Sequence, residues 1–268
     1  MTSTEHRLAV FVLAAWHIGC GSLGTEPNPD WTLVWSDEFD GPAGQLPNPA
    51  NWAFDVGTDW GNRQLEFDTD RPENVSLDGE GNLAITARRE SYGGSAYTSG
   101  RIKTQGLFEQ AYGRFEARIR LPLGQGIWPA FWLLGRNFAT VGWPECGEID
   151  VMEYRGQEPT IVHGTVHGPG YSAGRGLTAR YLLPGDRFDT RFHEFAIEWT
   201  EERIVWFVNG QRYLTVDRDD PPGRWAFDQP FFILLNVAVG GTFVGPPNES
   251  TNFPQSMLVD WVRVYQAK

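Results

Sequence analysis

The feature that most constrains the fold is a strict alternation of apolar and charged side chains in residues 113–122, GRFEARIRLP. Every second residue from Phe115 to Leu121 is apolar, and each residue between them is charged. A period of two predicts a β-strand with one buried and one exposed face. Residues 203–216 continue this theme, and the Asn209-Gly210 pair inside them is the strongest short signal for a β-hairpin.

The rest of the chain adds further strands and no long helix. The segments FHEFAIEWT (192–200), FFILLNVAVGG (231–241) and MLVDWVRVYQ (257–266) read as strands. No stretch has a persuasive long amphipathic helical period, and turns rich in Gly and Pro separate the strands. This pattern predicts an all-β, antiparallel sandwich. Because there is no internal repeat and no change of composition after Trp31, we expect one domain over residues 31–268.

The first thirty residues have the pattern of an export signal followed by a linker. The apolar run LAVFVLAAW (8–16) is too short to span a bilayer and is typical of a signal-peptide core. HIGC then ends at Cys20 like a bacterial lipoprotein cleavage site, so residues 1–20 predict secretion, either with a lipid anchor on Cys20 or without one. Residues 21–30 are a polar linker. The other cysteine, Cys146, leaves no partner for a disulfide in the mature domain, and we interpret it as a packing residue.

The charge of the chain limits its partners. The formal net charge is −12 at pH 7, which argues against nucleic acid and against an anionic membrane surface. Hydrophobic residues make up 41% of the chain and charged residues 21%, as in a soluble globular protein. We expect a monomer without a transmembrane segment.

An acidic stretch, ECGEIDVMEY (145–154), sets carboxylates among apolar residues. In a regular strand, Glu148, Asp150 and Met152 share one face, and Glu153 points to the other. One extra residue, a β-bulge, would return Glu153 to the face of Glu148 and Asp150. The two glutamates could then close to the roughly 5–5.5 Å of a retaining glycosidase pair. Taken alone, the acidic pattern is equally consistent with a solvated strand face or a cation site.

Tryptophans near this stretch shift the balance towards carbohydrate binding. The segment GIWPAFWLLG (126–135) puts Trp128 and Trp132 on one strand face, and Trp143 precedes the acidic stretch. Indole rings stack on the apolar faces of sugar rings, although core packing is the alternative for each of them. Three indoles close to the carboxylates favour a sugar-binding cleft.

The motif GEIDVMEY resembles the E-x-D-x-x-E signature of glycoside hydrolase family 16 in its bulged form. The resemblance covers most of residues 31–266 and points to the bacterial laminarinase branch, through LVWSDEFDG (33–41), DWGNRQLEFDT (59–69), SGRIKT (99–104), HGTVHGPGYS (163–172) and LLNVAVGG (234–241). It implies a β-jelly roll of two curved antiparallel sheets with a substrate cleft across the concave face. The chain departs from this branch at Phe67 and Asp68, where Tyr and Thr are common.

The resemblance implies a secreted endo-β-1,3-glucanase that also accepts mixed β-1,3/1,4-glucan, retains the anomeric configuration and uses no organic cofactor. Glu148 would be the nucleophile, Glu153 the general acid/base and Asp150 the auxiliary carboxylate. The residues implied to line the sugar subsites are Asn62, Arg101, Trp128, Trp132, Trp143, His167 and Asn236. For His167 a structural hydrogen bond is the alternative, and no third ligand signature supports zinc at the two histidines of HGTVH.

The family often carries a structural calcium ion on the convex face. The matching positions are the side chain of Asp260 and the backbone carbonyls of Glu38 and Gly81, and oxygen ligands suit calcium. A plain hydrogen-bonding role for Asp260 is the alternative.

Three other functions compete with the glucanase reading. A galactan hydrolase of the agarose type shares the bulged motif, but the WPAFWLLG and HGTVHGPGYS segments argue against it. A transglycosylase differs only in whether water or sugar resolves the intermediate. A non-catalytic glucan-binding module would have little reason to keep all three acids of the motif.

Overall fold

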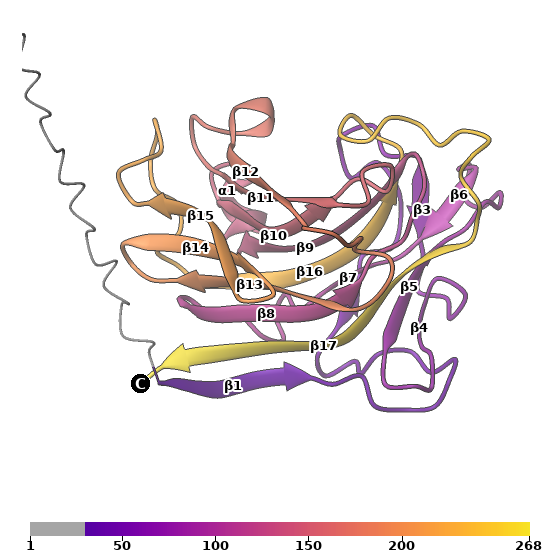
Figure 1. Ribbon diagram of the computed structural model, residues 1–268, viewed down its shortest axis with the longest axis horizontal. Helices are drawn as coiled ribbons and strands as arrows, with labels where there is room; N and C mark the ends of the chain where they lie inside the picture. The colour runs from indigo at the N-terminus through magenta and orange to yellow at the C-terminus, as the bar shows by residue number, and fades with distance from the viewer. Residues whose placement is uncertain (1–29) are drawn as a thin grey trace, which may run out of the picture.

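The computed structural model describes residues 30–268, which form two large β-sheets and one small sheet (Figure 1). The first sheet has eight strands, in the spatial order β15 (Gln211–Asp217), β14 (Arg203–Val208), β13 (His193–Trp199), β8 (Gly113–Arg120), β17 (Gln255–Ala267), β5 (Leu83–Ala87) and β4 (Val75–Leu77), with β1 (Trp31–Asp37) also paired to β17. The second has seven strands, in the order β12 (Leu177–Leu182), β11 (Ile161–His167), β10 (Glu148–Tyr154), β9 (Ile127–Gly135), β16 (Phe231–Val239), β7 (Arg101–Lys103) and β2 (Ala53–Phe54). The remaining elements are β3 (Glu66–Asp68), β6 (Tyr97–Ser99) and two short helices, α1 (Phe138–Val141) and η1 (Ala173–Arg175).

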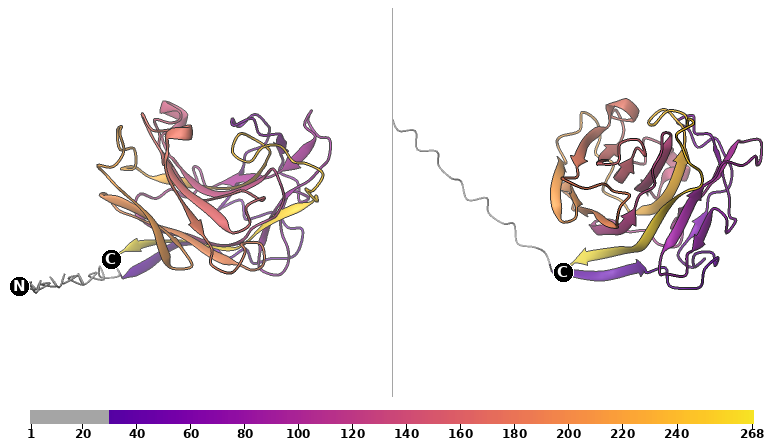
Figure 2. Two further views of the ribbon diagram at one scale, coloured as in Figure 1. Left: turned by 45° about the horizontal axis from the view of Figure 1, so that its top comes forward. Right: turned by 45° about the vertical axis from the view of Figure 1, so that its right-hand side comes forward.

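The predicted all-β sandwich is confirmed, and Figure 2 shows the two large sheets curving around a shared interior. Every strand pair inside them is antiparallel. The exception to the prediction is β3, which pairs with β6 in parallel. Parallel partners need a long crossover, and here the chain makes β4 and β5 of the eight-stranded sheet between them.

Some expectations concern residues at the beginning of the chain. The signal peptide over residues 1–20, the lipidation of Cys20 and all but the last residue of the linker lie outside the described residues. Among residues 30–268, none of the helices has the length and apolar character needed to cross a bilayer.

The alternation in residues 113–122 becomes β8, near the middle of the eight-stranded sheet. Phe115, Ala117 and Ile119 are fully buried in the core between the sheets, while Arg120 is exposed. The Asn209-Gly210 pair joins β14 to β15 with positive φ angles of 48° and 75°, as a tight hairpin requires. Both predictions from the sequence are therefore confirmed.

The apolar run 231–241 forms β16, whose nine residues are all buried because both of its faces are covered. One face belongs to the main core between the sheets. On the other face, Leu234 packs with Leu134, Cys146 and Phe232 in a small separate cluster. Cys146 is buried and free, as its interpretation as a packing residue requires.

A β-bulge interrupts β10 at Val151 and Met152. Against β9, Asp150 lies opposite Trp132 and Met152 opposite Phe131, so that Val151 is an extra residue. Against β11, Asp150 lies opposite Thr165 and Glu153 opposite His163, so that two residues of β10 face Gly164 alone. Val151 and Met152 both point into the main core, where their exposed fractions are 2% and 0%. The predicted bulge is thus present, with Met152 turned away from the carboxylates.

Candidate active site

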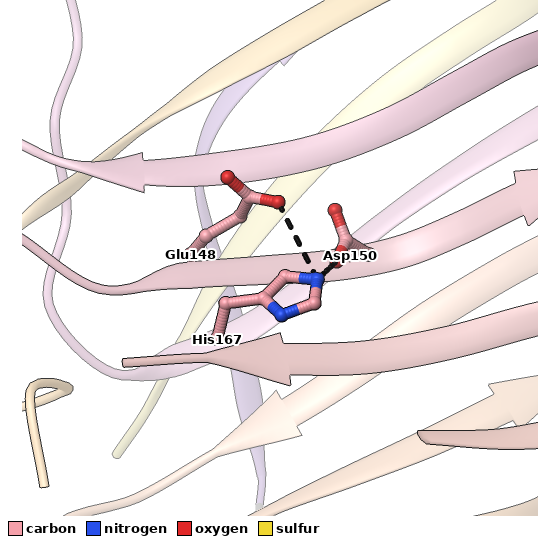
Figure 3. Close-up of side chains that lie close together, drawn as sticks. All are labelled: Glu148, Asp150 and His167. Carbon is pink, nitrogen blue, oxygen red and sulfur yellow. Dashed lines mark ion pairs between the residues drawn. The ribbon is translucent and has the colours of Figure 1, made fainter. Parts of the chain in front are cut away.

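The bulge leaves three carboxylates of β10 on the outer face of the seven-stranded sheet. Glu148 and Asp150 come before it and Glu153 after it, and the side chain of Asp150 is only 5% exposed. The neighbouring strand β11 supplies His167, which lies directly opposite Glu148. Its Nε2 is 3.4 Å from Oδ2 of Asp150 and 3.8 Å from Oε1 of Glu148 (Figure 3). His167 therefore lies beside two of the three carboxylates of β10.

Glu153 has a different environment at the other end of the bulge. The indole Nε1 of Trp128 donates a hydrogen bond of 3.1 Å to Oε1 of Glu153. Trp128 is 8% exposed and packs against Phe243, with 5.1 Å between the ring centroids. The sequence did not indicate this contact between Trp128 and Glu153.

Burial raises the pKa of all three carboxylates of β10. Burial and then the charge of Asp150 raise the pKa of Glu148 well above its usual range, while the charges of His167 and Arg101 act in the opposite direction. Burial raises the pKa of Asp150 to about 7. Burial and then the charge of Asp150 raise the pKa of Glu153 to about 8, against the hydrogen bond from Trp128. Burial and the repulsion between these carboxylates therefore favour a site that keeps a proton near neutral pH.

A second group of predicted residues surrounds Arg101 on β7. Its guanidinium lies 5.0 Å from the ring centroid of Trp60 and 4.9 Å from that of Trp132, and its Nε bonds Oδ2 of Asp55 at 3.0 Å. Trp132 also donates a hydrogen bond of 2.8 Å to Oδ1 of Asn236, which pairs with Arg101 across the strands. The structure thus brings three predicted residues together, and Trp60 and Asp55 join them although the sequence analysis did not select them.

The last two predicted sugar-binding residues lie in loops. Trp143 is 42% exposed, and its ring centroid is 6.0 Å from that of His167, so it stands beside the Glu148 end of the site. Asn62 is exposed on the loop before β3. A side chain at Gly241 would meet both the backbone oxygen of Asn62, at 3.0 Å, and the ring of Trp128, at 3.3 Å. Asn62 therefore borders the Glu153 end.

The predicted calcium positions converge on the eight-stranded sheet. Val259 pairs with Leu83 and Val262 pairs with Asp37, so Asp260 lies next to both the Gly81 turn and the residue after β1. This donor set is all oxygen, which suits calcium. Arg118 donates to Oδ2 of Asp260 and leaves Oδ1 free for another partner. The Glu38 carboxylate pairs with Arg263, but the expected ligand from Glu38 is its backbone carbonyl.

Comparison with known proteins agrees with this geometry. The laminarinase catalytic domain of Thermotoga maritima superposes with a TM-score of 0.84 at 46% identity, covering 89% of this chain and 99% of that chain. The endo-β-1,3-glucanase of Pyrococcus furiosus superposes with a TM-score of 0.84 at 44% identity, covering 89% and 95%. A β-glucanase of Rhodothermus marinus is 44% identical over 97% of this chain and 94% of its own length.

A pair of carboxylates is the catalytic group of most glycoside hydrolases, and the comparisons place the chain in that class. Within that class, the family model of the glycosyl hydrolases family 16 matches residues 57–263, and the chain belongs to this family.

Proposed function

We propose that the protein is an endo-β-1,3-glucanase that retains the anomeric configuration of its substrate. The observation that carries the proposal is the bulge of β10, which returns Glu153 to the sheet face of Glu148 and Asp150. The names of the relatives support the substrate, since they include a laminarinase, an endo-β-1,3-glucanase and a β-glucanase at 44–46% identity. No step of the proposed reaction uses an organic cofactor.

In the first step, the Glu148 carboxylate attacks the anomeric carbon and forms a C–O bond to it while the glycosidic C–O bond breaks. Glu153 gives its proton to the leaving oxygen. In the second step, Glu153 takes a proton from water, the resulting hydroxide oxygen bonds to the anomeric carbon, and Glu148 leaves. Two inversions at one carbon give net retention, and both carboxyl groups return to their starting states.

The surroundings of the two glutamates support this division of roles. Glu148 lies beside His167, and the charges of His167 and Arg101 act on it in the direction of ionisation, against the larger effects of burial and of Asp150 that raise its pKa. Glu153 receives its hydrogen bond from a neutral indole, and its pKa of about 8 keeps it protonated at neutral pH. Asp150 lies between them and raises the pKa of both by its charge.

The substrate range within the family is the finer part of the proposal. We infer activity on laminarin first and on mixed β-1,3/1,4-glucan second, because two relatives from Rhizobium meliloti are named endo-1,3-1,4-β-glycanases. A relative from Sphingobacterium multivorum named a keratan-sulfate endo-1,4-β-galactosidase, 34% identical, keeps galactan as the second candidate. The relative from Penaeus monodon named a β-1,3-glucan-binding protein, 35% identical over 60% of this chain, keeps binding without hydrolysis as the third.

The decisive experiment measures reducing ends released from laminarin, lichenan, cellulose, xyloglucan and agarose, together with the anomeric form of the first product by NMR. We expect fastest release from laminarin, slower release from lichenan, and a β-anomer that mutarotates afterwards. Faster release from agarose would replace the substrate assignment. An α-anomer as first product would overturn the retaining mechanism, and binding of laminarin without release would make the protein a binding module.

We also propose that the protein is an exported monomer with a structural calcium ion. Export is supported by the apolar run 8–16 and by HIGC before the linker. Calcium is supported by the oxygen donors of Glu38, Gly81 and Asp260, which would join β1, the turn before β5 and β17. Mass spectrometry of the mature N-terminus distinguishes lipidated Cys20 from a free end, and sedimentation tests the monomer.

A further inference from the structure

The bulge in β10 is held by a hydrogen bond that crosses the core between the two sheets. The indole Nε1 of Trp206 donates to the backbone carbonyl of Asp150 at 2.8 Å. Trp206 belongs to β14 in the eight-stranded sheet and is fully buried, whereas Asp150 belongs to the seven-stranded sheet. The ladder of strand hydrogen bonds is disrupted at a bulge, and a buried carbonyl there needs another donor. Trp206 provides that donor.

The strand beside the bulge is shaped to admit this indole. Gly164 of β11 is the single residue that faces Val151 and Met152. A Cβ atom at Gly164 would lie 2.6 Å from Cδ1 and 2.9 Å from Nε1 of Trp206, so any larger residue would collide with the ring. The same Cβ would lie 2.4 Å from the hydroxyl of Tyr213. Tyr213 is itself the extra residue of a second register shift, between β14 and β15, at Trp206. Two irregularities in opposite sheets therefore meet at Gly164.

The position of the bulge decides which way Glu153 points. Side chains alternate along a strand, so moving the extra residue to the far side of Glu153 would turn Glu153 from the outer face into the core. We propose that Trp206 is a positioning residue for the reaction: by fixing the carbonyl of Asp150, it fixes the bulge at Val151 and Met152 and aims Glu153 at the leaving oxygen. This inference rests on the proposed role of Glu153 as the general acid.

The test compares Trp206→Phe with a matched control, Trp199→Phe. Trp199 belongs to the same sheet, is 1% exposed, and also donates its Nε1 hydrogen to a backbone carbonyl, that of Phe227 at 3.1 Å. Both variants lose one buried indole donor and leave one carbonyl without it. Only Trp206→Phe removes the donor from the bulge.

Each variant is assayed on laminarin, whose leaving group needs a proton, and on a dinitrophenyl β-laminaribioside, whose leaving group does not. We expect Trp206→Phe to lower kcat on laminarin by about 100-fold, the size of loss that a misplacement of about 1 Å can cause, with KM within about twofold. The loss in kcat/KM on the dinitrophenyl substrate should be under about tenfold, because kcat/KM reports only the first step, where this leaving group needs no proton. Trp199→Phe should keep the wild-type ratio of the two rates even if its melting temperature falls.

An unchanged ratio in Trp206→Phe, or an equal change in Trp199→Phe, would overturn the proposal, because the hydrogen bond would then serve stability alone. If Trp206→Phe does not fold, Gly164→Ala, which displaces the same indole from the other side, is measured in its place. If neither variant folds, Trp206 supports the whole sandwich rather than the bulge, and the proposal fails. Glu153→Gln is assayed on the same two substrates. If Glu153→Gln loses activity selectively on laminarin and Trp206→Phe does not, only the positioning role of Trp206 is rejected. If Glu153→Gln shows no selective loss on laminarin, the role of Glu153 as the general acid is rejected.

Discussion

Two strands of this protein carry buried carboxylates in close succession, and only one of them forms the candidate active site. β10 has Glu148, Asp150 and Glu153, while β3 has Glu66 and Asp68, which are 1% and 2% exposed. Burial raises the pKa of Glu66 to about 7 and that of Asp68 well above its usual range, as it does on β10. Neither burial nor a raised pKa therefore distinguishes the two strands.

The partners of the carboxylates distinguish the strands. On β10, the imidazole of His167 and the indole of Trp128 reach the carboxylates from neighbouring strands. On β3, Glu66 accepts a hydrogen bond of 2.8 Å from the backbone nitrogen of Val239. One buried oxygen of Asp68 has no hydrogen-bond partner within the described residues, which is also true of Oδ2 of Asp150 on β10. A catalytic site needs donors and a proton acceptor placed around a reacting atom. The pair on β3 is a buried acidic pair without that arrangement.

The largest effect is expected from Glu148→Gln, which keeps the shape of the side chain and removes the nucleophile. We expect hydrolysis of laminarin to fall by ~10⁴-fold or more, while laminarin binding measured by calorimetry stays close to that of the wild type. Glu66→Gln serves as the comparison and should keep more than about half of the activity, since Glu66 is not proposed to touch substrate. Residual activity above a few per cent in Glu148→Gln would contradict the assignment.

Glu66→Gln should instead change stability, and only above acidic pH. The folded protein holds the pKa of Glu66 above its usual range, so the unfolded chain loses this proton first as the pH rises. The free energy of unfolding is therefore reduced progressively between about pH 4.5 and 7 and stays reduced above that, by about 3 kcal/mol.

Replacing Glu66 with Gln removes this cost. We expect chemical denaturation of Glu66→Gln to show a stability gain at pH 8 that vanishes near pH 4.5. Glu249→Gln on an exposed loop is the control and should show no such trend. A gain of equal size at both pH values would mean that folding does not raise the pKa of Glu66.

Calcium should affect the thermal stability of the protein and leave its rate of catalysis unchanged. A ligand that binds only the folded state at a hundredfold excess over its Kd stabilises it by about 2.7 kcal/mol. We expect chelator to lower the melting temperature by about 5–10 °C, and Asp260→Ala to abolish this response.

A different result of the chelator experiment would place the metal ion at the carboxylates of β10. Ligand atoms of Glu148, Asp150 and His167 all lie within 4.8 Å of one another, a spacing that could also hold a cation. Loss of catalysis on chelation while the protein stays folded would move the metal to this site.

The smallest expected effect concerns the hydrogen bond from Trp128 to Glu153. Its hydrogen bond favours the ionised form of Glu153, so Trp128→Phe should raise the pKa of Glu153 and move the basic limb of the pH–rate profile upward by about one unit. Trp132→Phe is the matched control, because its indole bonds Asn236 instead. A shift to lower pH in Trp128→Phe, or an equal shift in Trp132→Phe, would show that the bond to Glu153 does not tune this proton.

The sequence predicted what depends on local periodicity. The alternation in β8 and the Asn209-Gly210 turn each follow from the residues around them, and both are present. The bulge in β10 is also present, but regular alternation argues against it, and it was expected from the resemblance to the bulged motif. The hydrogen bonds of the aromatic residues could not be predicted, because the neighbouring strand decides which group the edge of a ring meets. Trp128 was interpreted as a sugar-stacking residue, and the structure adds a hydrogen bond from its Nε1 to Glu153.

Contacts between distant segments could not be predicted. β3 has three residues and owes its parallel pairing to β6, on the far side of β4 and β5, so nothing local marks Glu66 and Asp68 as buried. The bond from Trp206 to Asp150 joins residues 56 positions apart in different sheets. The pattern of residues 203–216 predicted a strand there, not which carbonyl Trp206 would meet.

The pairing of β17 has a consequence for how the protein is made. This strand lies between β8 and β5 and also pairs with β1 (Figure 1). The eight-stranded sheet can therefore not be completed until β17 has been synthesised. Until then, β1, β5 and β8 each lack a neighbour, and their contacts with β17 span a large part of the sequence. Contacts that join such distant residues make folding slow, so the chain is expected to become compact only some time after its last strand has been synthesised.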